Sequence, residues 1–591
     1  VFRKCSGEIQ DFLLQICIFD SFSREQAEYI WGQDNAEILL RQLVSQNAFI
    51  KHDQVNNMYN MHNIFTSYLR QIFNRQGLDR QQAVWKAAGK WYVSAGDYIR
   101  AMNYFYQAGD FDDLLIAMER EKGNNITNEH KERMIQYFSN CPKEIKREHP
   151  WACLIYAINL FSFNEMELFA QECGEIGEYI ESMQGEQRET KEQLAGELEL
   201  LCSFAKYNSI TGMSEHLQRA CGLLKGPSQF LDRNGSWTFG SPSVLYMFYR
   251  ESGQLERTVH EMNAAMPQYC WLTAGHGSGA EYVMQAERYY NIGDFENAEI
   301  AAHKAMYTAR SQEQMAIVLC ALFLQLRLAS VKGNLAYIMN TLQQMRDEIK
   351  QRGLFLYFHT WDLCEGFVYS HLNQENKVPS WIVKGNWQDS TIYFPSYAFC
   401  NVIQGKALLL GGQYFKLLAL TEAFIGIASI FPNLLGQVYT YIYEAAAKLK
   451  LGRCNEAKAT LLKALDIAVP DQIIMPFVEN GEYILDLLLK LQKDGHHPVF
   501  LSKICTILPS LIKTRERMVA ELSSGDRKLQ LTEREWTIAE LVATGLSNQA
   551  IGKTLHIAEV TVKKALQSIY AKLNINSRTA LTKVIIEQKT G

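Results

Sequence analysis

The feature that most constrains the fold is a repeat of about forty residues in the middle of the chain. Turn-forming residues recur there at intervals of 40, 40, 39 and 40 positions, at Gly293, Gly333, Asn373, Gly412 and Gly452. Each follows a helix-like stretch and can take the left-handed conformation that ends a helix. An apolar residue stands five positions after each marker, at Ala298, Ile338, Val378, Leu417 and Ala457. This spacing predicts stacked helical hairpins, that is, an α-solenoid.

The predicted hairpins resemble tetratricopeptide-like (TPR-like) repeats, although their period is longer than the usual 34 residues. We predict this solenoid over residues 76–480. Such solenoids expose a long concave surface that binds peptides, proteins or small ligands. A spacer is the alternative, but aromatic residues make up 12% of the chain and a spacer has little need of them. We therefore expect the repeats to sense a small-molecule or protein inducer. Residues 225–242 and 275–279 are predicted to be loops.

The last sixty residues predict three short helices joined by tight turns. Thr532 and Glu535 form a capping box at the start of the first helix, and Leu531 and Trp536 fit the positions of a hydrophobic staple. This helix is expected to stop at Gly545, which can adopt the left-handed conformation.

Ser547 caps the second helix, and the third carries an apolar stripe. The stripe consists of Val562, Leu566, Ile569 and Leu573. Because successive helical residues are about 100° apart, Lys564, Gln567 and Ala571 point away from the stripe, with Lys563 on its flank. Lysine and glutamine can both contact base edges or phosphates. The order of these features predicts a helix-turn-helix that binds the DNA major groove.

The distribution of charge agrees with this prediction. Residues 526–591 contain ten Lys or Arg and six Asp or Glu, a net charge of +4. The whole chain has a net charge of −5, so the rest carries −9. A basic tail on an acidic body is typical of a tail that contacts nucleic acid. A helical bundle with a solvated lysine face is the alternative, and the ordered series of caps and turns argues against it.

Residues 531–579 resemble the LuxR-type helix-turn-helix. The matching positions are Arg534, Glu535, Gly545, Ser547, Asn548, Ile551, Thr561, Val562, Lys563, Tyr570, Lys572, Leu573, Arg578 and Thr579. In that family the start of the third helix contacts bases and phosphates. The resemblance therefore implies that Thr561, Lys563, Lys564 and Gln567 bind double-stranded DNA.

Three positions depart from the family pattern. Ala558 replaces the Ser that would cap the third helix, a loss of about 0.5–2 kcal/mol in typical cases. Ala565 replaces the usual His, and Gly552 replaces an Ala at a cost of about 1 kcal/mol of helix propensity. These changes bear on affinity and base preference rather than on the fold.

The first seventy-five residues predict a winged helix. Two helices over residues 8–30 and a third around 39–43 precede two short strands at 48–50 and 59–61, and a helix returns over 62–69. This pattern resembles the winged-helix domain that follows the ATPase core in signal-transduction ATPases. The similarity is greatest to large ATP-binding LuxR-type regulators related to the maltose-regulon activator.

In these regulators a Met-His-Asp-like element contacts the bound nucleotide, and residues 61–63 here read Met-His-Asn. The resemblance implies that His62 faces the phosphates of ADP in the resting state, supplied by an upstream ATPase domain. A wing-edge histidine without a ligand is the alternative. The sequence does not begin with Met, and we expect that it starts inside a longer protein, N-terminally truncated here.

No enzyme motif is complete in the sequence. A phosphate-binding loop is absent, since the segment 552–554 (Gly-Lys-Thr) has Ser547 where the first glycine would stand. His260 and Glu261 begin a zinc-protease-like motif, but Ala264 replaces its second histidine. We therefore expect no catalytic residues, no metal site and no cofactor held by this chain alone, with ATP or ADP bound only by the upstream domain.

The thirteen cysteines are scattered, with no Cys-x-x-Cys and no secretory signal, which favours reduced thiols in a cytoplasm. No apolar run reaches the roughly 20 residues of a membrane span. The longest candidate, residues 417–431, contains Glu422 and is interpreted as a buried helix.

The sequence thus predicts a mainly α chain in four parts: a winged helix (1–75), a TPR-like solenoid (76–480), a helical connector (481–525) and a LuxR-type helix-turn-helix (526–591). We interpret it as a bacterial-type transcription activator in which an inducer controls self-association on DNA, with RNA polymerase as a further candidate partner. The alternative is a protein-interaction scaffold with a degenerate helix-turn-helix, for which Ala558 and Ala565 give some support.

Overall fold

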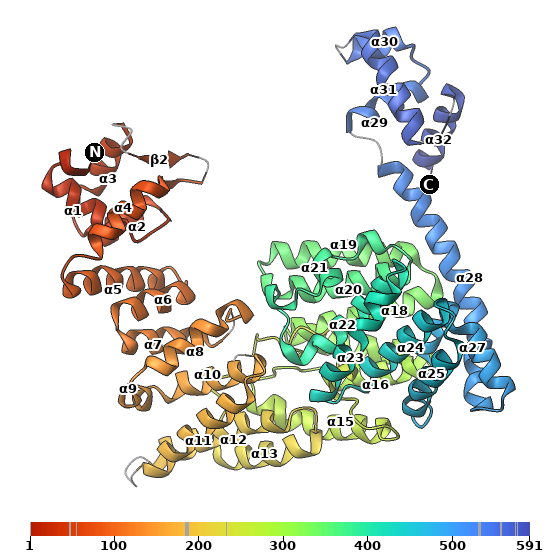
Figure 1. Cartoon of the computed structure of the whole chain (residues 1–591), viewed down its shortest axis with the longest axis horizontal. Helices are drawn as coiled ribbons and strands as arrows, with labels where there is room; N and C mark the ends of the chain where they lie inside the picture. Colours follow the sequence, from red (N-terminus) through yellow and green to blue (C-terminus); the bar gives the residue numbers. More distant parts are fainter. Residues whose placement is uncertain are drawn as a thin grey trace.

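A computed structural model describes residues 2–45, 49–54, 56–123, 125–183, 188–231, 233–529, 533–555, 558–573, 575 and 577–590. The described chain is mainly α-helical, as predicted, and its three strands all lie near the N-terminus. Apolar side chains form three separate cores, over residues 2–88, 101–522 and 538–585. Figure 1 shows the first and last cores at the two ends of a long helical solenoid.

The N-terminal unit is a winged helix. Its elements are α1 (Gly7–Ile16), β1 (Ser21–Phe22), α2 (Arg24–Trp31), α3 (Ala36–Ser45), β2 (Ile50–Asp53), β3 (Met58–Met61) and α4 (Asn63–Phe73). The predicted helices and a two-stranded wing are present. The first wing strand runs over Ile50–Asp53 instead of the expected 48–50, of which Ala48 lies outside the described residues. The strand β1 was not predicted. It pairs antiparallel with β3, which also pairs antiparallel with β2.

The winged helix leads into an arm of helices that runs to the main part of the solenoid (Figure 1). The arm comprises α5 (Leu78–Ser94), α6 (Tyr98–Ala108), α7 (Phe111–Glu121), α8 (Lys131–Asn140), α9 (Lys143–Glu148), α10 (Pro150–Ser162), α11 (Met166–Ser182), α12 (Arg188–Ser203) and α13 (Ile210–Leu223). The first of these, α5, packs on the winged helix, because Val84 and Ala88 belong to that core.

The helices that follow form the repeat body. They are α14 (Leu245–Phe248), α15 (Leu255–Leu272), α16 (Ala280–Asn291), α17 (Phe295–Ser311), α18 (Met315–Lys332), α19 (Leu335–Gln351), α20 (Phe358–His371), α21 (Ser380–Lys384), α22 (Tyr397–Leu410), α23 (Tyr414–Ile430), α24 (Leu434–Lys450), α25 (Cys454–Ala468), α26 (Met475–Glu479) and α27 (Gly481–Lys493). Short 3-10 helices lie at Phe2–Lys4, Asn128–His130, Phe204–Lys206, Phe355–Tyr357, Glu375–Lys377, Trp387–Asp389 and Phe394–Ser396.

The forty-residue spacing marks the turns of these hairpins. All five markers have positive φ, with values of 86° at Gly293, 73° at Gly333, 54° at Asn373, 65° at Gly412 and 76° at Gly452. The five apolar residues that follow them are buried, with at most 6% of any side chain exposed. The third unit is less regular than the others, because α21 has only five residues.

The longest apolar segment is not the one that the sequence suggested. In the described part of the chain, one helix, α18, is long and apolar enough to cross a membrane, and 78% of that window is buried inside the protein. The helix also carries Arg327, which is paired in the core. The segment singled out before, 417–431, lies mostly in α23, where half of the surface faces solvent, as the exposed Phe415 and Ile430 illustrate.

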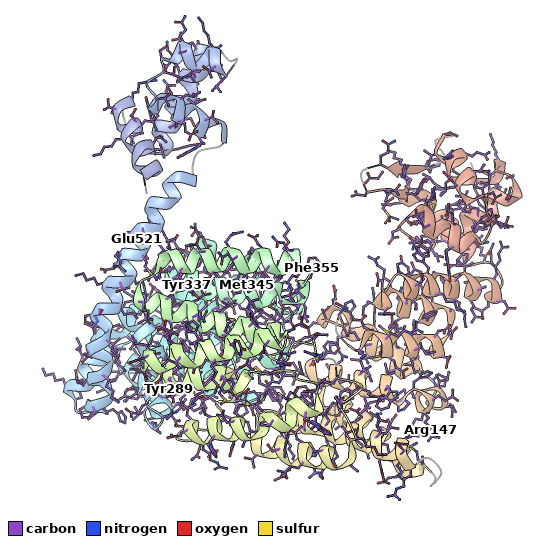
Figure 2. The ribbon with its side chains drawn as sticks, turned by 180° about the vertical axis from the view of Figure 1, so that it is seen from behind. Arg147, Tyr289, Tyr337, Met345, Phe355 and Glu521 are labelled. Carbon is purple, nitrogen blue, oxygen red and sulfur yellow. The ribbon has the colours of Figure 1, made fainter. Side chains whose placement is uncertain are left out.

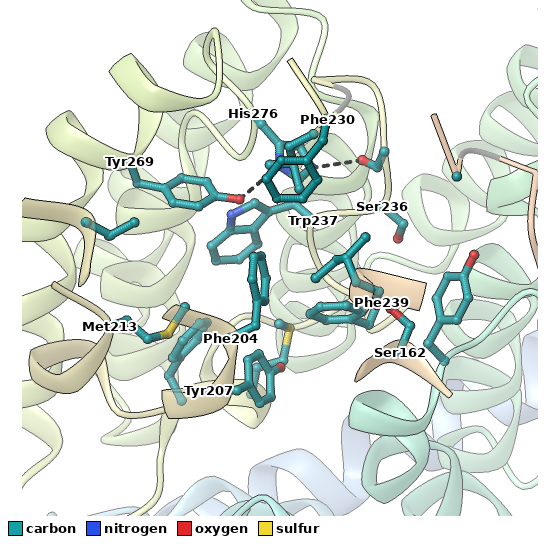
Figure 3. Close-up of a pocket in the computed structure, with 18 of the residues that line it drawn as sticks. Ser162, Phe204, Tyr207, Met213, Phe230, Ser236, Trp237, Phe239, Tyr269 and His276 are labelled. Atoms are coloured by element: carbon teal, nitrogen blue, oxygen red, sulfur yellow. Dashed lines mark hydrogen bonds between the residues drawn. The ribbon is translucent and has the colours of Figure 1, made fainter. Parts of the chain in front are cut away.

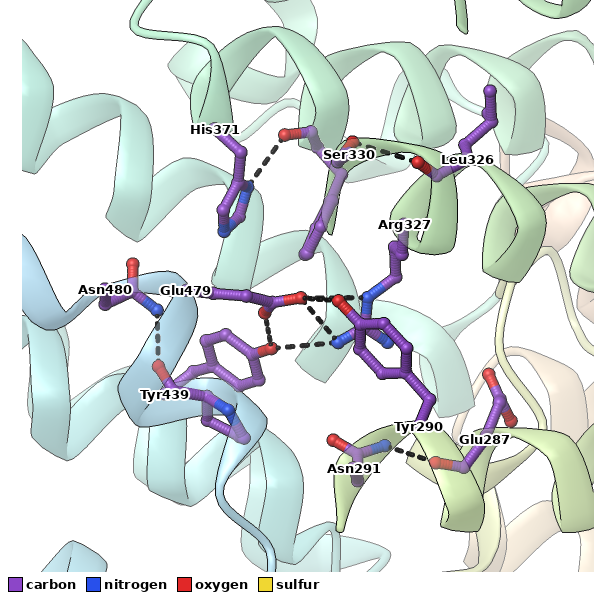
Figure 4. Close-up of polar contacts among 12 residues, drawn as sticks. Glu287, Tyr290, Asn291, Leu326, Arg327, Ser330, His371, Tyr439, Glu479 and Asn480 are labelled. Atoms are coloured by element: carbon purple, nitrogen blue, oxygen red, sulfur yellow. Dashed lines mark hydrogen bonds and ion pairs between the residues drawn. The ribbon is translucent and has the colours of Figure 1, made fainter. Parts of the chain in front are cut away.

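A buried polar cluster joins four helices of the repeat body (Figure 4). Arg327 of α18 forms an ion pair with Glu479 of α26, with 3.0 Å between Nη2 and Oε1. The hydroxyl of Tyr290 (α16) donates to the same carboxylate at 2.7 Å, and the hydroxyl of Tyr439 (α24) donates to its second oxygen. Such a cluster fixes the packing of its helices because every partner would be left unpaired elsewhere.

The segment predicted as a connector is helical but is part of the solenoid. The helix α28 (Pro498–Leu529) buries a stripe that continues to Leu522 in the same core as the repeats. Arg515 on this helix is 7% exposed, pairs with Glu482 at 2.9 Å and donates to the carbonyl of Glu479 at 2.8 Å. Figure 2 shows α28 leaving the body near Glu521.

Candidate nucleic-acid interface

The C-terminal unit, called here the DNA reader, consists of four helices. They are α29 (Glu533–Ala543), α30 (Asn548–Thr554), α31 (Glu559–Lys572) and α32 (Arg578–Thr590). The first three were predicted and the fourth was not. The helix α32 packs against α29 and adds Leu581 and Ile585 to the core. The Ser577 hydroxyl caps this helix by accepting from the Ala580 amide at 3.1 Å. The apolar pattern of α32 is weak, so its packing against α29 reveals it.

The turns between these helices follow the predicted chemistry. Gly545 has a φ of 86°, and the Ser547 hydroxyl accepts a hydrogen bond from the Ala550 amide at 3.2 Å. The predicted capping box and staple involve Leu531 and Thr532, which lie outside the described residues.

The recognition helix α31 has the two faces that the sequence predicted. Val562 and Ile569 are fully buried, and Leu566 and Leu573 are 5% exposed. The four predicted DNA contacts, Thr561, Lys563, Lys564 and Gln567, are all exposed. The structure therefore brings them together on the solvent side of one helix, available to a groove of DNA.

The two lysines differ in their surroundings. The Nζ atom of Lys563 lies 2.9 Å from Oε1 of Glu559, one turn earlier on the same helix. Lys564 has no ion-pair partner among the described residues. An exposed pair of this kind is worth little, so Lys563 can exchange its carboxylate for a phosphate, whereas Lys564 needs no exchange.

One residue of this face escaped the sequence analysis. Val560 is 63% exposed at the start of α31. It precedes Lys564 by four residues and Gln567 by seven, the spacing of one helical face. An exposed valine at this position can contact the methyl group of thymine. Its spacing from Lys564 could have indicated it, but the sequence analysis considered only polar residues for this face.

The exposed face is held in place by α29. The carboxylate of Glu535 accepts from the Ser568 hydroxyl at 2.8 Å and pairs with Lys572 at 2.6 Å. Ala558 occupies the N-cap of α31 and makes no side-chain cap. The N-terminal end of α31 therefore has no side-chain cap. The contacts of Ser568 and Lys572 with Glu535, near the C-terminal end, hold the helix in place.

A second contact ties the start of α32 to the turn between α29 and α30. The Arg578 guanidinium donates to the Asn548 side chain at 2.8 Å and to the carbonyl of Leu546. Glu535, Lys572, Asn548 and Arg578 are thus scaffold residues. The positions that match the LuxR pattern divide into this scaffold and the exposed start of α31.

The residue that the sequence predicted to contact a nucleotide, His62, lies in the winged helix. His62 is exposed at the N-cap of α4, where Nδ1 accepts from the Ile64 amide at 3.4 Å. Its neighbours Phe49 and Ile64 are 46% and 76% exposed. Two exposed apolar side chains therefore lie near the histidine, since the ring centroids of Phe49 and His62 are 6.0 Å apart. Among the described residues, no group of three or more His, Cys, Asp or Glu is arranged to hold a metal ion.

Three segments of the chain match known families. Residues 529–585 match the bacterial regulatory proteins of the luxR family. Residues 1–81 match the MalT winged helix domain, and residues 204–494 match the MalT-like TPR region. The chain is a DNA-binding transcriptional regulator whose C-terminal segment is similar to the luxR family. Its winged helix and its repeats are similar to those of MalT.

The chain is also similar to individual proteins. The HTH-type transcriptional regulator MalT of Vibrio cholerae is 21% identical to this regulator over 98% of the chain and 70% of the relative. A nitrate/nitrite response regulator protein homolog of Haemophilus influenzae is 39% identical over 17% of the chain and 49% of the relative. A signal-transduction ATPase from Pyrococcus horikoshii with a tetratricopeptide repeat sensor aligns over 80% of the chain and 65% of that structure, with 14% identity and a TM-score of 0.33.

Proposed function

We propose that this regulator is an inducer-controlled transcription activator that binds DNA through the exposed face of α31. The observation that carries the proposal is the grouping of Thr561, Lys563, Lys564 and Gln567 on one solvent-facing helix surface in a LuxR-type domain. Lysines there supply phosphate contacts, and Gln567 is suited to an adenine edge.

Control of DNA binding is proposed to act through self-association. One helix-turn-helix covers a single half-site and binds weakly, so regulators of this type are normally placed in pairs on DNA. The solenoid is proposed to sense the inducer and to expose or hide the surfaces that associate. RNA polymerase is proposed as the partner of the assembled activator, in a bacterial cytoplasm.

The winged helix is proposed to work with an upstream ATPase domain, which would make the switch sensitive to ADP and ATP. The exposed Phe49 and Ile64 beside His62 support a domain contact at this surface, since exposed apolar side chains that cluster mark interaction sites. In this proposal His62 meets the nucleotide phosphates, and the chain described here has no catalytic activity of its own.

The first test is a titration of the chain with random duplex DNA at two salt concentrations. Wild-type protein should bind with an affinity that falls as salt rises, because each bound phosphate releases counterions. The double variant Lys563→Ala/Lys564→Ala should lose this binding and show a shallower dependence on salt. Lys490→Ala, an exposed lysine of α27, is the matched control and should bind as wild type does.

The opposite outcome points to the scaffold alternative. If neither the wild type nor the double variant binds duplex DNA at low salt, the reader has lost its function, and protein partners of the solenoid become the subject. The uncapped N-terminus of α31 at Ala558 is the observation that keeps this outcome open.

A further inference from the structure

A cavity of about 140 Å³, partly open to solvent, lies at the junction of the arm and the repeat body. Its walls come from α10 and α13 of the arm, from the segment between α13 and α14, and from α15 of the body. Figure 3 shows these elements converging on one space. The segments 225–242 and 275–279 were predicted only as loops, and both contribute to it, through Trp237 and His276 among others.

The walls are rich in aromatic side chains. They include Phe204, Tyr207, Phe230, Trp237, Phe239 and Tyr269, each with at most 9% of its surface exposed. Trp237 lies against the backbone of Gly277, where a Cβ atom would stand 2.4 Å from Trp237 Cδ1. Gly277 also has a φ of 75°, so a glycine there lets the indole ring lie flat against the turn.

Most polar groups of the wall are paired within the protein. The Nε2 atom of His276 lies 3.2 Å from the carbonyl oxygen of Gly235, which requires Nε2 to carry the proton, and Nδ1 then accepts from the Tyr269 hydroxyl at 3.0 Å. The Tyr207 hydroxyl differs. This hydroxyl is buried, in a residue that is only 6% exposed, and it has no hydrogen-bond partner in the described structure.

Charge is nearly absent from the lining. Of the described residues that line the cavity, Lys122 alone is charged, and it is an exposed residue. A charged group deep in the cavity would lose its hydration without gaining a counter-ion. A sugar, with a hydroxyl on most of its carbons, would leave several hydroxyls unpaired against these aromatic walls.

We propose that this cavity is a binding site for a neutral molecule of about one aromatic ring that carries a single hydrogen-bonding group, and that this molecule acts as the inducer. A dry cavity of roughly 150 Å³ is enough for benzene. The aromatic walls favour a planar ring. The unpartnered Tyr207 hydroxyl is covered by the present packing, and in this proposal it becomes the partner of one polar group when the tyrosine turns toward the ligand. The inference rests on the proposed inducer-sensing role of the solenoid.

The site also suggests how a ligand would act. Arm and body are already joined beside the cavity, where the Tyr393 hydroxyl donates to the carbonyl of Ile126 at 2.7 Å and the Asn128 amide donates to the carbonyl of Ile392 at 2.8 Å. A molecule that fills the cavity adds contacts to both sides of this junction. It therefore favours the arrangement in which arm and body are closed on each other.

The test is calorimetric titration of the full chain with phenol, benzene and cyclohexanol. Phenol should bind with a dissociation constant of about 1 mM or tighter, a realistic value for seven heavy atoms. Cyclohexanol has the same size and hydroxyl group but no aromatic ring, and should bind at least 5-fold more weakly. Absence of phenol and benzene binding at 10-fold higher concentrations (~10 mM) would overturn the proposal.

Two variants locate the binding. Ala265 lines the cavity and Ala264 is its exposed neighbour on α15. Ala265→Leu should weaken phenol binding at least 10-fold, because the larger side chain fills the cavity. Ala264→Leu should leave phenol binding unchanged. Equal phenol binding by both variants would place the ligand elsewhere and refute the site.

A third variant tests the hydrogen bond. Tyr207→Phe should weaken phenol about 5-fold, the effect of one ordinary hydrogen bond, and leave benzene within 2-fold of wild type. Equal changes for phenol and benzene would remove Tyr207 from the proposal.

DNA binding, measured on the same samples, separates this inference from the proposed function. Salt-dependent DNA binding without phenol binding would refute the cavity proposal and leave the proposed DNA-binding function standing. If the wild-type chain binds phenol but does not bind DNA, the cavity is a ligand site, and its proposed role as an inducer site is refuted.

Discussion

At the scale of single residues, the two lysines of α31 should contribute unequally to DNA binding. Lys563 is paired with Glu559, and Lys564 is not paired among the described residues. We predict that Lys564→Ala weakens DNA binding more than Lys563→Ala does and lowers the salt slope by about 1. Glu559→Gln should strengthen binding, because it removes a carboxylate beside the phosphates. Fluorescence anisotropy with labelled duplex at several salt concentrations measures all three, and equal losses for both lysines would contradict the asymmetry.

A buried lysine makes the stability of the repeat body depend on pH. Lys406 of α22 is fully buried, and its Nζ donates to the Asn480 side chain at 2.9 Å. Burial, reinforced by the charge of Arg515, lowers the pKa of Lys406 to about 7. Between pH 7 and the usual pKa of a lysine, the unfolded chain binds the proton that the folded chain releases. The contribution of Lys406 to stability therefore rises with pH across this window.

The variant Lys406→Met tests this dependence. Between pH 7 and 9 the wild type should gain about 2–3 kcal/mol of unfolding free energy relative to the variant, at roughly 1.4 kcal/mol per pH unit. Urea unfolding of both proteins at the two pH values gives the difference, and other titrating groups cancel because both proteins contain them. A difference that stays constant with pH would show that Lys406 keeps its proton in the folded protein.

At the scale of secondary structure elements, two glycines near one helix should respond oppositely to the same substitution. Gly412 precedes α23 with a φ of 65°, and Gly426 lies inside α23; a Cβ atom would meet nothing within 4 Å at either position. Gly412→Ala should destabilise the body by about 1 kcal/mol, because alanine is strained in the left-handed region. Gly426→Ala should stabilise it by a similar amount, about 1 kcal/mol, through helix propensity. Midpoints of urea unfolding that move in the same direction would refute this assignment.

These turns also show what the sequence could reveal. The repeat was predictable because a left-handed turn is a local requirement, met by Gly or Asn at each marker whatever the surroundings. The exposed face of α31 was predictable for the same reason, since helical periodicity alone separates Lys564 from Val562. The role of Glu535 was not, because its partners Ser568 and Lys572 are more than thirty residues away.

The elements that the sequence missed depend on packing. The helix α32 has a weak apolar pattern of its own and gains its place against α29. The segment 225–242 has no regular period, yet it brings Trp237 and Phe239 into the same cavity as residues of α10 and α15. The sequence positions of these residues do not predict that they meet, because only the tertiary fold brings them together.

At the scale of the whole molecule, the two ends of the chain can influence each other only through the solenoid. Figure 1 shows the winged helix and the DNA reader at opposite ends, with arm and body between them. The arm and the body share one continuous core, whereas each end has a core of its own. A signal from the winged helix or from the cavity must therefore reach α28, which carries the reader.

The anchoring of α28 should then depend strongly on Arg515. Its guanidinium is buried and holds Glu482 and the carbonyl of Glu479. Arg515→Ala leaves these groups without their partner and should cost about 3 kcal/mol. Lys513→Ala is the matched control on the same helix, because Lys513 is an exposed cation of α28 and its side chain does not enter the core.

Hydrogen exchange distinguishes local loosening from general unfolding. In Arg515→Ala the amides of residues 511–522 should exchange faster, while those of α31 and of the body before α26 keep their wild-type rates. This pattern follows because α28 is the last element added to the core and the reader has a core of its own. Uniformly faster exchange would mean that Arg515 supports the whole body, and unchanged exchange would mean that the apolar stripe through Leu522 suffices to hold α28.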